Sequence, residues 1–304
     1  MAETSASAPF GRVLTAMVTP FSADGALDPD TAQGLAHHLV EHGHDGLVIL
    51  GTTGESPTVG DDEAATLWRA VVEAVAGQAV VVAGVGTNDT RHSVELARQA
   101  EKCGADGLLV VTPYYSKPPQ EGVAQHFVTV ADATDLPVML YDIPGRTGTR
   151  IAAETFARVA GHERIVAVKD AVGDLGAGSW VMQRTGLAYY SGDDVLNLGW
   201  LTHGAAGVVS VVGHVAGDDY AAMVAAIDSG DLPAARQIYR RLLPAVEAIM
   251  TRTQGAIMVK AALELQGVLP NRAVRPPLVE ATEGQIDQLR PDLLAAGLLQ
   301  DTGA

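Results

Sequence analysis

Eight short runs rich in β-branched and other apolar residues alternate with amphipathic segments along most of this chain. The runs cover residues 14–21, 46–51, 80–86, 107–113, 137–144, 165–171, 188–192 and 207–213. Segments between them, such as 28–42 and 61–76, have helical character, and each of these two opens on an aspartate, which favours a helix N-terminus. Eight strand–helix units in about 220 residues match the number and size of a (β/α)8 barrel. The sequence therefore predicts this α/β fold.

The chain after residue 231 has a different pattern. Strand signals stop, and three helical stretches remain at 232–250, 256–266 and 283–299. Thr282 and Gln285 have the spacing of a capping box for the last stretch. We therefore predict a flexible N-terminal tail at 1–10, a catalytic barrel at 11–230 and a three-helix C-terminal extension at 231–304.

A doubly wound parallel sheet is the structural alternative to a barrel. Its nucleotide-binding form needs a glycine-rich turn directly after the first strand. The first run ends instead in Pro20-Phe21-Ser22, which is no such turn. The barrel is therefore the favoured interpretation.

Charge and cysteine content exclude several classes of protein. A formal net charge of −16 repels phosphate backbones and anionic membrane surfaces, so we expect neither nucleic acid nor a membrane as a partner. A single cysteine, Cys103, forms no intramolecular disulfide. The segment Met1–Pro9 lacks the basic start and apolar core of a signal peptide, and no apolar run approaches the roughly 20 residues of a membrane-spanning helix. We expect a cytoplasmic protein.

The histidines and large aromatic residues give no sign of a metal site. Solvated or capping roles are favoured for the histidines on or just after the helical segment 28–42, which are His37, His38, His42 and His44. No other histidine and carboxylate grouping has the spacing of metal ligands, so we expect neither a metal nor a cofactor. We expect packing roles for Trp68, Trp180, Trp200, Tyr189 and Tyr190.

One lysine stands inside a run that is predicted to be a buried strand. Lys169 lies within Ile-Val-Ala-Val-Lys-Asp-Ala at 165–171, and only four of the 20 lysine and arginine residues are lysines. Burying an ammonium is costly unless it is paired or neutralised, and arginine holds its proton too tightly to become a free amine nucleophile. We therefore expect Lys169 to form a Schiff base with a carbonyl substrate.

Polar residues stand where the other predicted strands end, which is the catalytic rim of a barrel. Tyr141 lies on the run before that of Lys169, and its hydroxyl could bond the amine. The turn 51–56 can present the hydroxyls of Thr52 and Thr53 to a carboxylate. The planar guanidinium of Arg146 can pair with a carboxylate through two hydrogen bonds. Each has an open alternative: a structural turn at 51–56, a surface salt bridge for Arg146, rim packing for 112–115, and a helix N-cap for 191–194.

Five motifs together resemble one known family. They are Gly-Thr-Thr-Gly-Glu at 51–55, Pro-Tyr-Tyr at 113–115, Tyr-Asp-Ile-Pro-Gly-Arg-Thr-Gly at 141–148, Val-Lys-Asp at 168–170 and Ser-Gly-Asp-Asp at 191–194. In this order they resemble the dihydrodipicolinate synthase family, also called 4-hydroxy-tetrahydrodipicolinate synthases, of the class I pyruvate-dependent aldolase superfamily. The resemblance covers almost the whole chain. It implies a lyase that condenses pyruvate with L-aspartate 4-semialdehyde in lysine and diaminopimelate biosynthesis, assembled as a homotetramer of tight dimers.

The resemblance also implies a role for each candidate residue. Lys169 would be the Schiff-base lysine, and Tyr141 the proton donor and acceptor. Thr52 would link Tyr141 to Tyr115, which in the family reaches into the neighbouring subunit's site. The implied substrate-binding residues are Thr53 for the pyruvate carboxylate, Arg146 for the carboxylate of the semialdehyde, and the backbone of Gly192 and Val209 near pyruvate.

One residue departs from the family pattern, and two alternative functions remain. Asp142 stands where the family more often has asparagine, which replaces a possible donor with an acceptor. A sialic-acid (N-acetylneuraminate) lyase or a 2-keto-3-deoxy sugar-acid aldolase would keep Lys169 and Tyr141, but such enzymes generally lack the Pro-x-Arg-Thr-Gly arrangement around Arg146. A catalytically silent regulatory paralogue is the remote alternative.

Feedback by lysine is a separate expectation. Family members that lysine inhibits typically have histidines at the positions of Asp61 and Ala64 and a glutamate at that of His92, near Ser56, Asn88 and Tyr114. We therefore expect weak or absent inhibition by lysine.

Overall fold

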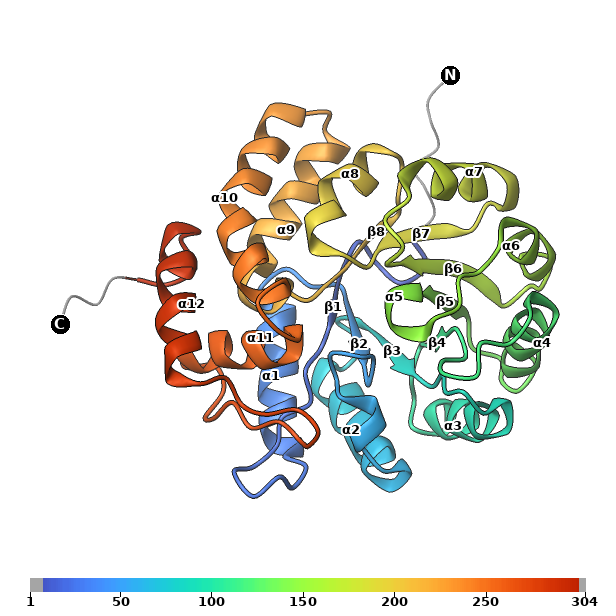
Figure 1. Ribbon diagram of the computed structural model, residues 1–304, viewed down its shortest axis with the longest axis horizontal. Coiled ribbons are helices and arrows are strands. Elements are labelled where there is room, and N and C mark those ends of the chain that lie inside the picture. The colour runs from blue at the N-terminus through green and yellow to red at the C-terminus, as the bar shows by residue number, and fades with distance from the viewer. Residues whose placement is uncertain (1–7, 301–304) are drawn as a thin grey trace.

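The computed structural model describes residues 8–300 and contains a closed barrel of eight parallel strands in sequential order (Figure 1). The predicted barrel is confirmed. The strands are β1 (Val13–Ala16), β2 (Gly46–Ile49), β3 (Val80–Gly84), β4 (Gly107–Val111), β5 (Val138–Asp142), β6 (Ile165–Asp170), β7 (Ala188–Ser191) and β8 (Gly207–Ser210).

Every strand ends earlier than the apolar run that predicted it. β1 stops at Ala16 and β8 at Ser210, whereas the runs continue to residues 21 and 213. The last residues of each run lie beyond the strand, in the segment that follows it. The chain thus places the ends of these runs at the C-terminal rim of the barrel, where a (β/α)8 enzyme has its active site.

The barrel interior is a packed core that Phe10 closes at the N-terminal end. Inward-facing residues include Leu14, Val48, Met139 and Tyr141. Phe10 is fully buried and lies against Gly107, the first residue of β4, and its backbone N–H donates to Tyr190 Oη over 3.1 Å. The predicted tail therefore has to end before Phe10, because an apolar side chain at this position fills the barrel floor. The rest of the predicted tail, residues 1–7, lies outside the described residues.

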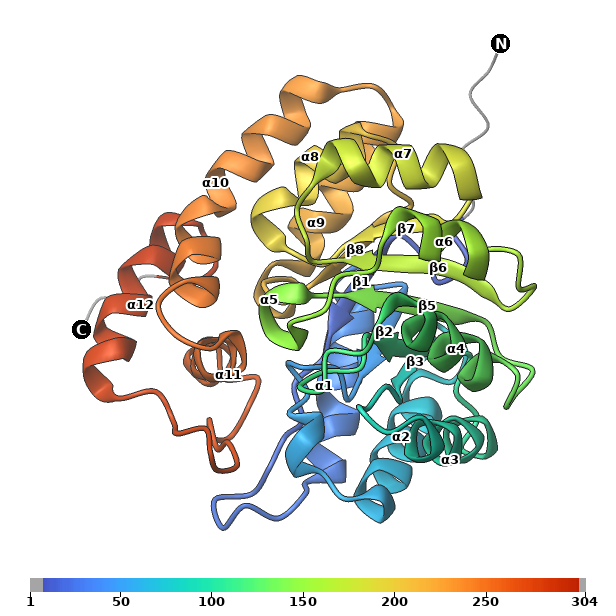
Figure 2. The same cartoon turned by 45° about the vertical axis from the view of Figure 1, so that its right-hand side comes forward.

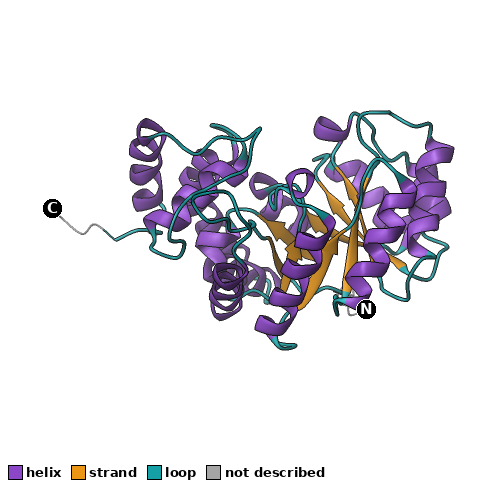
Figure 3. Cartoon of the chain, turned by 90° about the horizontal axis from the view of Figure 1, so that it is seen from below, coloured by secondary structure: helices purple, strands orange, loops and turns teal. Residues whose placement is uncertain are grey.

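Helices follow the strands and cover the outside of the barrel, as Figure 3 shows. Asp28 caps the first by accepting from Thr31 N over 3.0 Å. The helices are α1 (Pro29–Glu41), α2 (Asp61–Val75), α3 (Thr90–Lys102), α4 (Gln120–Ala131), α5 (Pro144–Thr147), α6 (Ala153–Val159), α7 (Leu175–Thr185), α8 (Asn197–Thr202) and α9 (Gly213–Asp228), with 3-10 turns η1 (Ser56–Thr58) and η2 (Asp194–Leu196).

Three further helices, α10 (Leu232–Met250), α11 (Gly255–Leu265) and α12 (Glu283–Ala295), lie together on one side of the barrel, where α10 and α11 pack against α9 (Figures 1 and 2). The predicted capping box of Thr282 and Gln285 is present at the start of α12. Leu242 and Leu289 of these helices belong to the same hydrophobic core as the outer barrel wall. The division into a barrel at 11–230 and an extension at 231–304 stays a prediction.

The predicted capping role is confirmed for His44, although it is not solvated, and the predicted packing role is wrong for Trp180. His44 is buried, and both its nitrogens are bonded, to Thr15 Oγ1 at 2.5 Å and to Leu39 O at 2.8 Å; burial lowers its pKa to about 4. It ties the end of the α1 segment to β1 instead of facing solvent. Trp180 is 61% exposed on α7, whereas Trp68 and Trp200 are buried as expected. In residues 8–300, no helix is both long and apolar enough to cross a membrane.

Candidate active site

A cavity of about 500 Å³ opens at the C-terminal ends of the strands. Four of the predicted site residues line it, from two loops, strand β5 and helix α5: Thr52, Tyr115, Tyr141 and Arg146. Gln254 and Leu278, from the C-terminal part of the chain, complete the wall. The cavity therefore lies where barrel enzymes bind their substrates, and the C-terminal extension contributes to it.

Lys169 and Tyr141 are neighbours inside the barrel. They are register partners on β6 and β5, and both side chains are almost completely buried. Lys169 Nζ lies over the face of the Tyr141 ring, 4.4 Å from its centroid. The predicted pairing is thus present, but as an amine over an aromatic face, not as a hydrogen bond to the hydroxyl.

The environment shifts the pKa of both groups. Burial lowers the pKa of Lys169 to about 8, an effect that the Asp194 carboxylate opposes and the charge of Arg146 reinforces. Burial raises the pKa of Tyr141 to about 12, partly opposed by a hydrogen bond with the Thr52 hydroxyl. The amine therefore loses its proton more easily than a free lysine, while the phenol keeps its own.

The segment after β7 supports Lys169. The Gly192 N–H donates to Asp170 O over 2.7 Å, and a Cβ at Gly192 would lie 3.0 Å from Lys169 Cγ. Only glycine leaves room for the lysine side chain at this position. The adjacent Asp194 is buried and accepts from Ser210 Oγ and from Val211 N at 2.9 Å. The predicted N-cap alternative is therefore wrong for this segment, because the carboxylate instead joins the ends of β7 and β8.

The turn after β2 brings Thr52 to the cavity and buries Thr53. Thr53 is buried and does not line the cavity, and neither does Val209, which is buried in the barrel core. The turn is closed by backbone bonds from Gly54 N to Gly51 O and from Glu55 N to Thr52 O. Glu55 has a φ of +56°, in the left-handed region that is unfavourable for a non-glycine residue. Tertiary contacts have to maintain this turn.

Tyr115 and Arg146 stand at the mouth. Tyr115 is 88% exposed with a φ of +72°, so an aromatic side chain is held out into solvent by a strained backbone. Arg146 on α5 is exposed, and it forms no ion pair with any residue between 8 and 300. The surface salt bridge that was the alternative for Arg146 is therefore absent from the described part of the chain.

Contacts that hold the site together were missed at the sequence level. Lys260 of α11 is buried against Glu55, and Arg275 pairs with Glu63 at 2.6 Å. The signal for Lys260 was available: like Lys169, it is a lysine inside an apolar segment, here Ala256–Leu265. Its partner could not be found from sequence, since Glu55 lies more than 200 positions earlier. Across residues 8–300, no three histidine, cysteine or carboxylate side chains are grouped as metal ligands.

Comparison with known proteins agrees with this architecture. Residues 9–296 match the dihydrodipicolinate synthetase family. The chain is 67% identical to the 4-hydroxy-tetrahydrodipicolinate synthase of Kineococcus radiotolerans, over 95% of this chain and 94% of that one. A crystal structure of the Cyanidioschyzon merolae enzyme with lysine bound superimposes with a TM-score of 0.93 at 43% identity, covering 96% of this chain and 100% of that one.

A second solved structure contains pyruvate. The chloride-inhibited enzyme of Acinetobacter baumannii, in complex with pyruvate, has a TM-score of 0.91 at 33% identity, covering 95% of this chain and 99% of that one. The family match and the similarity both extend over nearly the full length. The chain therefore belongs to the dihydrodipicolinate synthetase family and is an enzyme of the pyruvate-dependent class I aldolase type.

Proposed function

We propose that Lys169 forms a Schiff base with pyruvate, and that the resulting enamine adds to the aldehyde carbon of L-aspartate 4-semialdehyde, as 4-hydroxy-tetrahydrodipicolinate synthases do. The observation that carries the proposal is a buried lysine whose pKa is lowered to about 8 at the catalytic rim of the barrel. Pyruvate in the related Acinetobacter enzyme supports the first substrate.

The chemistry requires proton transfers that hydroxyl groups can perform. The Lys169 amine adds to the ketone carbon and water leaves, so the imine nitrogen becomes an electron sink. A methyl proton then departs and the enamine carbon forms the new bond to the aldehyde. Because the Tyr141 pKa is raised to about 12, its phenol keeps a proton to donate near pH 7. In our proposal Thr52 relays protons between Tyr141 and Tyr115.

The remaining residues bind and orient the substrates. We propose that Thr53 binds the pyruvate carboxylate and that Gly192 and Val209 provide the backbone near pyruvate. Arg146 receives the carboxylate of the semialdehyde, because its guanidinium is exposed at the mouth and has a geometry that matches a carboxylate.

We further propose a homotetramer built from two tight dimers, in which Tyr115 enters the neighbouring subunit's site. An 88% exposed tyrosine on a strained backbone supports this arrangement, since a partner surface would bury it.

Trapping the imine tests the proposed chemistry. Pyruvate and borohydride together should add one reduced pyruvyl group per chain, and Lys169→Ala should remove this mass increase. Lys117→Ala, which replaces another lysine near the site, should retain it. An adduct that survives Lys169→Ala would contradict the proposed nucleophile.

Steady-state rates distinguish the second substrate. L-Aspartate 4-semialdehyde should be preferred over a sugar-derived aldehyde, and Arg146→Ala should raise the KM for the semialdehyde far more than the KM for pyruvate. A preference for the sugar-derived aldehyde would favour the sialic-acid lyase or sugar-acid aldolase alternative. An imine without turnover of any aldehyde would favour the silent paralogue.

A further inference from the structure

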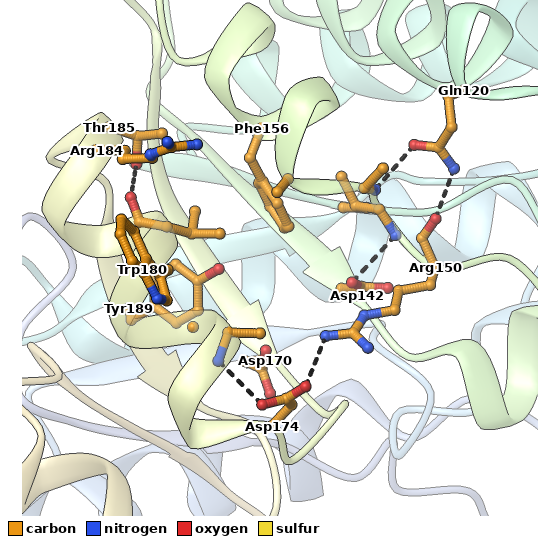
Figure 4. Close-up of a pocket in the computed structure, with 16 residues that line it drawn as sticks. Gln120, Asp142, Arg150, Phe156, Asp170, Asp174, Trp180, Arg184, Thr185 and Tyr189 are labelled. Carbon is orange, nitrogen blue, oxygen red and sulfur yellow. Dashed lines mark hydrogen bonds and ion pairs between the residues drawn. The ribbon is translucent and has the colours of Figure 1, made fainter.

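A second cavity lies outside the barrel, between α6 and α7. Its volume is about 710 Å³, and it shares no lining residue with the candidate active site. Figure 4 shows Trp180 on one side, Asp142 and Arg150 on the other, and Phe156 between them. Side chains alternate between the two faces of a strand, so the residues that follow Tyr141 and Lys169 point outward into this cavity.

Two buried carboxylates form the inner end of this cavity. Asp142 and Asp170 are register partners on β5 and β6, and are 1% and 5% exposed. Asp170 Oδ1 accepts from Val172 N and Gly173 N, both at 3.0 Å. Asp142 Oδ2 accepts from Ile151 N at 3.2 Å, but Asp142 Oδ1 is buried without a hydrogen-bond partner. One carboxylate oxygen on the cavity wall is therefore unsatisfied.

No cation within residues 8–300 pairs with either carboxylate. The nearest candidate, Arg150, binds Asp174 at 3.4 Å, and both of these side chains are about half exposed at the cavity rim. Arg184 lies over the Trp180 ring, 5.1 Å from its centroid. Burial raises the pKa of Asp142 to about 7, and the charge of Asp170 adds to this shift, whereas the hydrogen bond from Ile151 N and the more distant charge of Arg150 oppose it.

The walls are apolar and aromatic. Phe156 and Tyr189 line the cavity beside the carboxylates, and Val181 and Trp180 continue the surface toward solvent. Such walls accommodate a hydrocarbon chain and favour a cation near an aromatic face. The polar end, formed by Asp142 and Asp170, accepts hydrogen bonds. An organic cation fits both the apolar walls and the polar end.

We propose that this outer cavity binds a small primary amine, whose ammonium group donates to Asp142 Oδ1 between Asp142 and Asp170 and whose alkyl part packs on Phe156 and Tyr189. The site is separate from the Schiff-base lysine, because strands β5 and β6 lie between the two cavities. It does not depend on the proposed condensation reaction.

Calorimetric titration with n-butylammonium tests the proposal, with 1-butanol as the neutral probe of the same size. At pH 8 and constant ionic strength, n-butylammonium should bind saturably, at one site per chain. It should bind at least about tenfold more tightly than 1-butanol, because a charged hydrogen bond is involved. Equal binding of the two probes, or no saturable binding of the amine, would overturn the proposal.

Four variants identify the site. Asp142→Asn keeps the shape of the side chain and should weaken amine binding about tenfold. Asp174→Asn at the exposed rim should change it by no more than about twofold. Lys169→Ala should leave it unchanged; loss of binding in this variant would place the amine in the active site instead. Phe156→Leu, which retains the carboxylates, should weaken n-butylammonium and 1-butanol equally. Unchanged amine affinity in Asp142→Asn would refute the site.

Discussion

Lys260 Nζ donates to Glu55 Oε1 over 2.6 Å and thereby joins α11 to the turn that carries Thr52 and Thr53. Both side chains of the pair are 1% exposed. Nζ also donates to Ala273 O at 2.7 Å, and Glu55 Oε2 accepts from Arg275 N at 2.9 Å. This buried network holds Glu55 in its left-handed conformation. The C-terminal extension is thus coupled to the candidate active site.

Lys260→Met should destabilise the protein and reduce its activity. Removing one partner of a buried ion pair leaves the other charge unpaired, which typically costs about 3–5 kcal/mol in the free energy of unfolding. The turn should also lose its support, so kcat should fall. Urea denaturation and steady-state kinetics measure these effects. Arg158→Ala, which removes the exposed pair with Glu121, is the matched control and should leave the urea midpoint unchanged. Equal midpoints for both variants would show that the network is dispensable.

Imine formation with pyruvate should depend on pH through Lys169. With a pKa of about 8, about a tenth of the amine is neutral at pH 7, whereas an ordinary lysine with a pKa near 10.4 is about 0.04% neutral. The rate of borohydride-trapped adduct formation should therefore rise about tenfold per unit below pH 8 and level off above it. A rate that keeps rising to pH 10 would show an unshifted lysine.

Mixed assemblies test whether Tyr115 acts in the neighbouring subunit. Tyr115→Phe and Lys169→Ala should each be nearly inactive when purified alone. If Tyr115 enters the partner's site, random mixing after reversible dissociation creates one intact site in each mixed dimer, and about a quarter of the wild-type activity returns. No recovery, despite proven subunit exchange, would place Tyr115 in its own subunit's site or outside the catalytic machinery.

Asp142→Asn should stabilise the folded chain above neutral pH. Asp142 has a folded pKa of about 7, above the value near 3.9 in an unfolded chain, so the folded state binds its proton more tightly. The wild-type chain therefore loses stability relative to the variant as pH rises from about 4 to about 7, on the order of 2–4 kcal/mol in total. Urea denaturation at pH 5 and pH 8 measures this difference. A stability difference between the two proteins that does not change with pH would contradict the raised pKa of Asp142.

Lysine should inhibit weakly or not at all. His92 stands at a position where lysine-sensitive members of the family typically have a glutamate. Its Nε2 lies 3.1 Å from Asp61 Oδ1. The Asp61 carboxylate is thus engaged by His92, and a histidine stands at the position from which a glutamate could accept an ammonium group. Initial rates at increasing lysine concentration provide the test. Inhibition by lysine below about 1 mM, the upper end of typical KM values, would refute this prediction.

Sequence patterns identified the eight strands and the unusual position of Lys169, but not the residues at which the strands end. All eight strands were found because apolar runs of β-branched residues have few structural alternatives once eight of them alternate with helices. Lys169 stood out because an ammonium inside such a run demands an explanation. Each strand ended before its run did, since the direction in which a rim loop leaves the barrel depends on neighbouring loops.

Environments that depend on distant residues were out of reach of the sequence. His44 was expected in solvent or at a cap, and it does cap α1 through Leu39 O, but its burial against β1 depends on the fold. Trp180 was expected in the core, yet the face of α7 that carries it points outward. The partner of Glu55 lies on α11, and only folding brings the two charges together.

The sequence by itself determined the barrel and singled out Lys169 as the proposed nucleophile, with hydroxyl and arginine residues as its proposed partners, because local hydrophobic patterns and residue chemistry are properties of short segments. The tertiary structure alone decided how Lys169 sits over the Tyr141 ring, why Glu55 is held in a strained turn, and that Asp142 and Asp170 form the wall of a second cavity. These depend on register between strands and on burial, which arise only when segments far apart in the chain share one desolvated space.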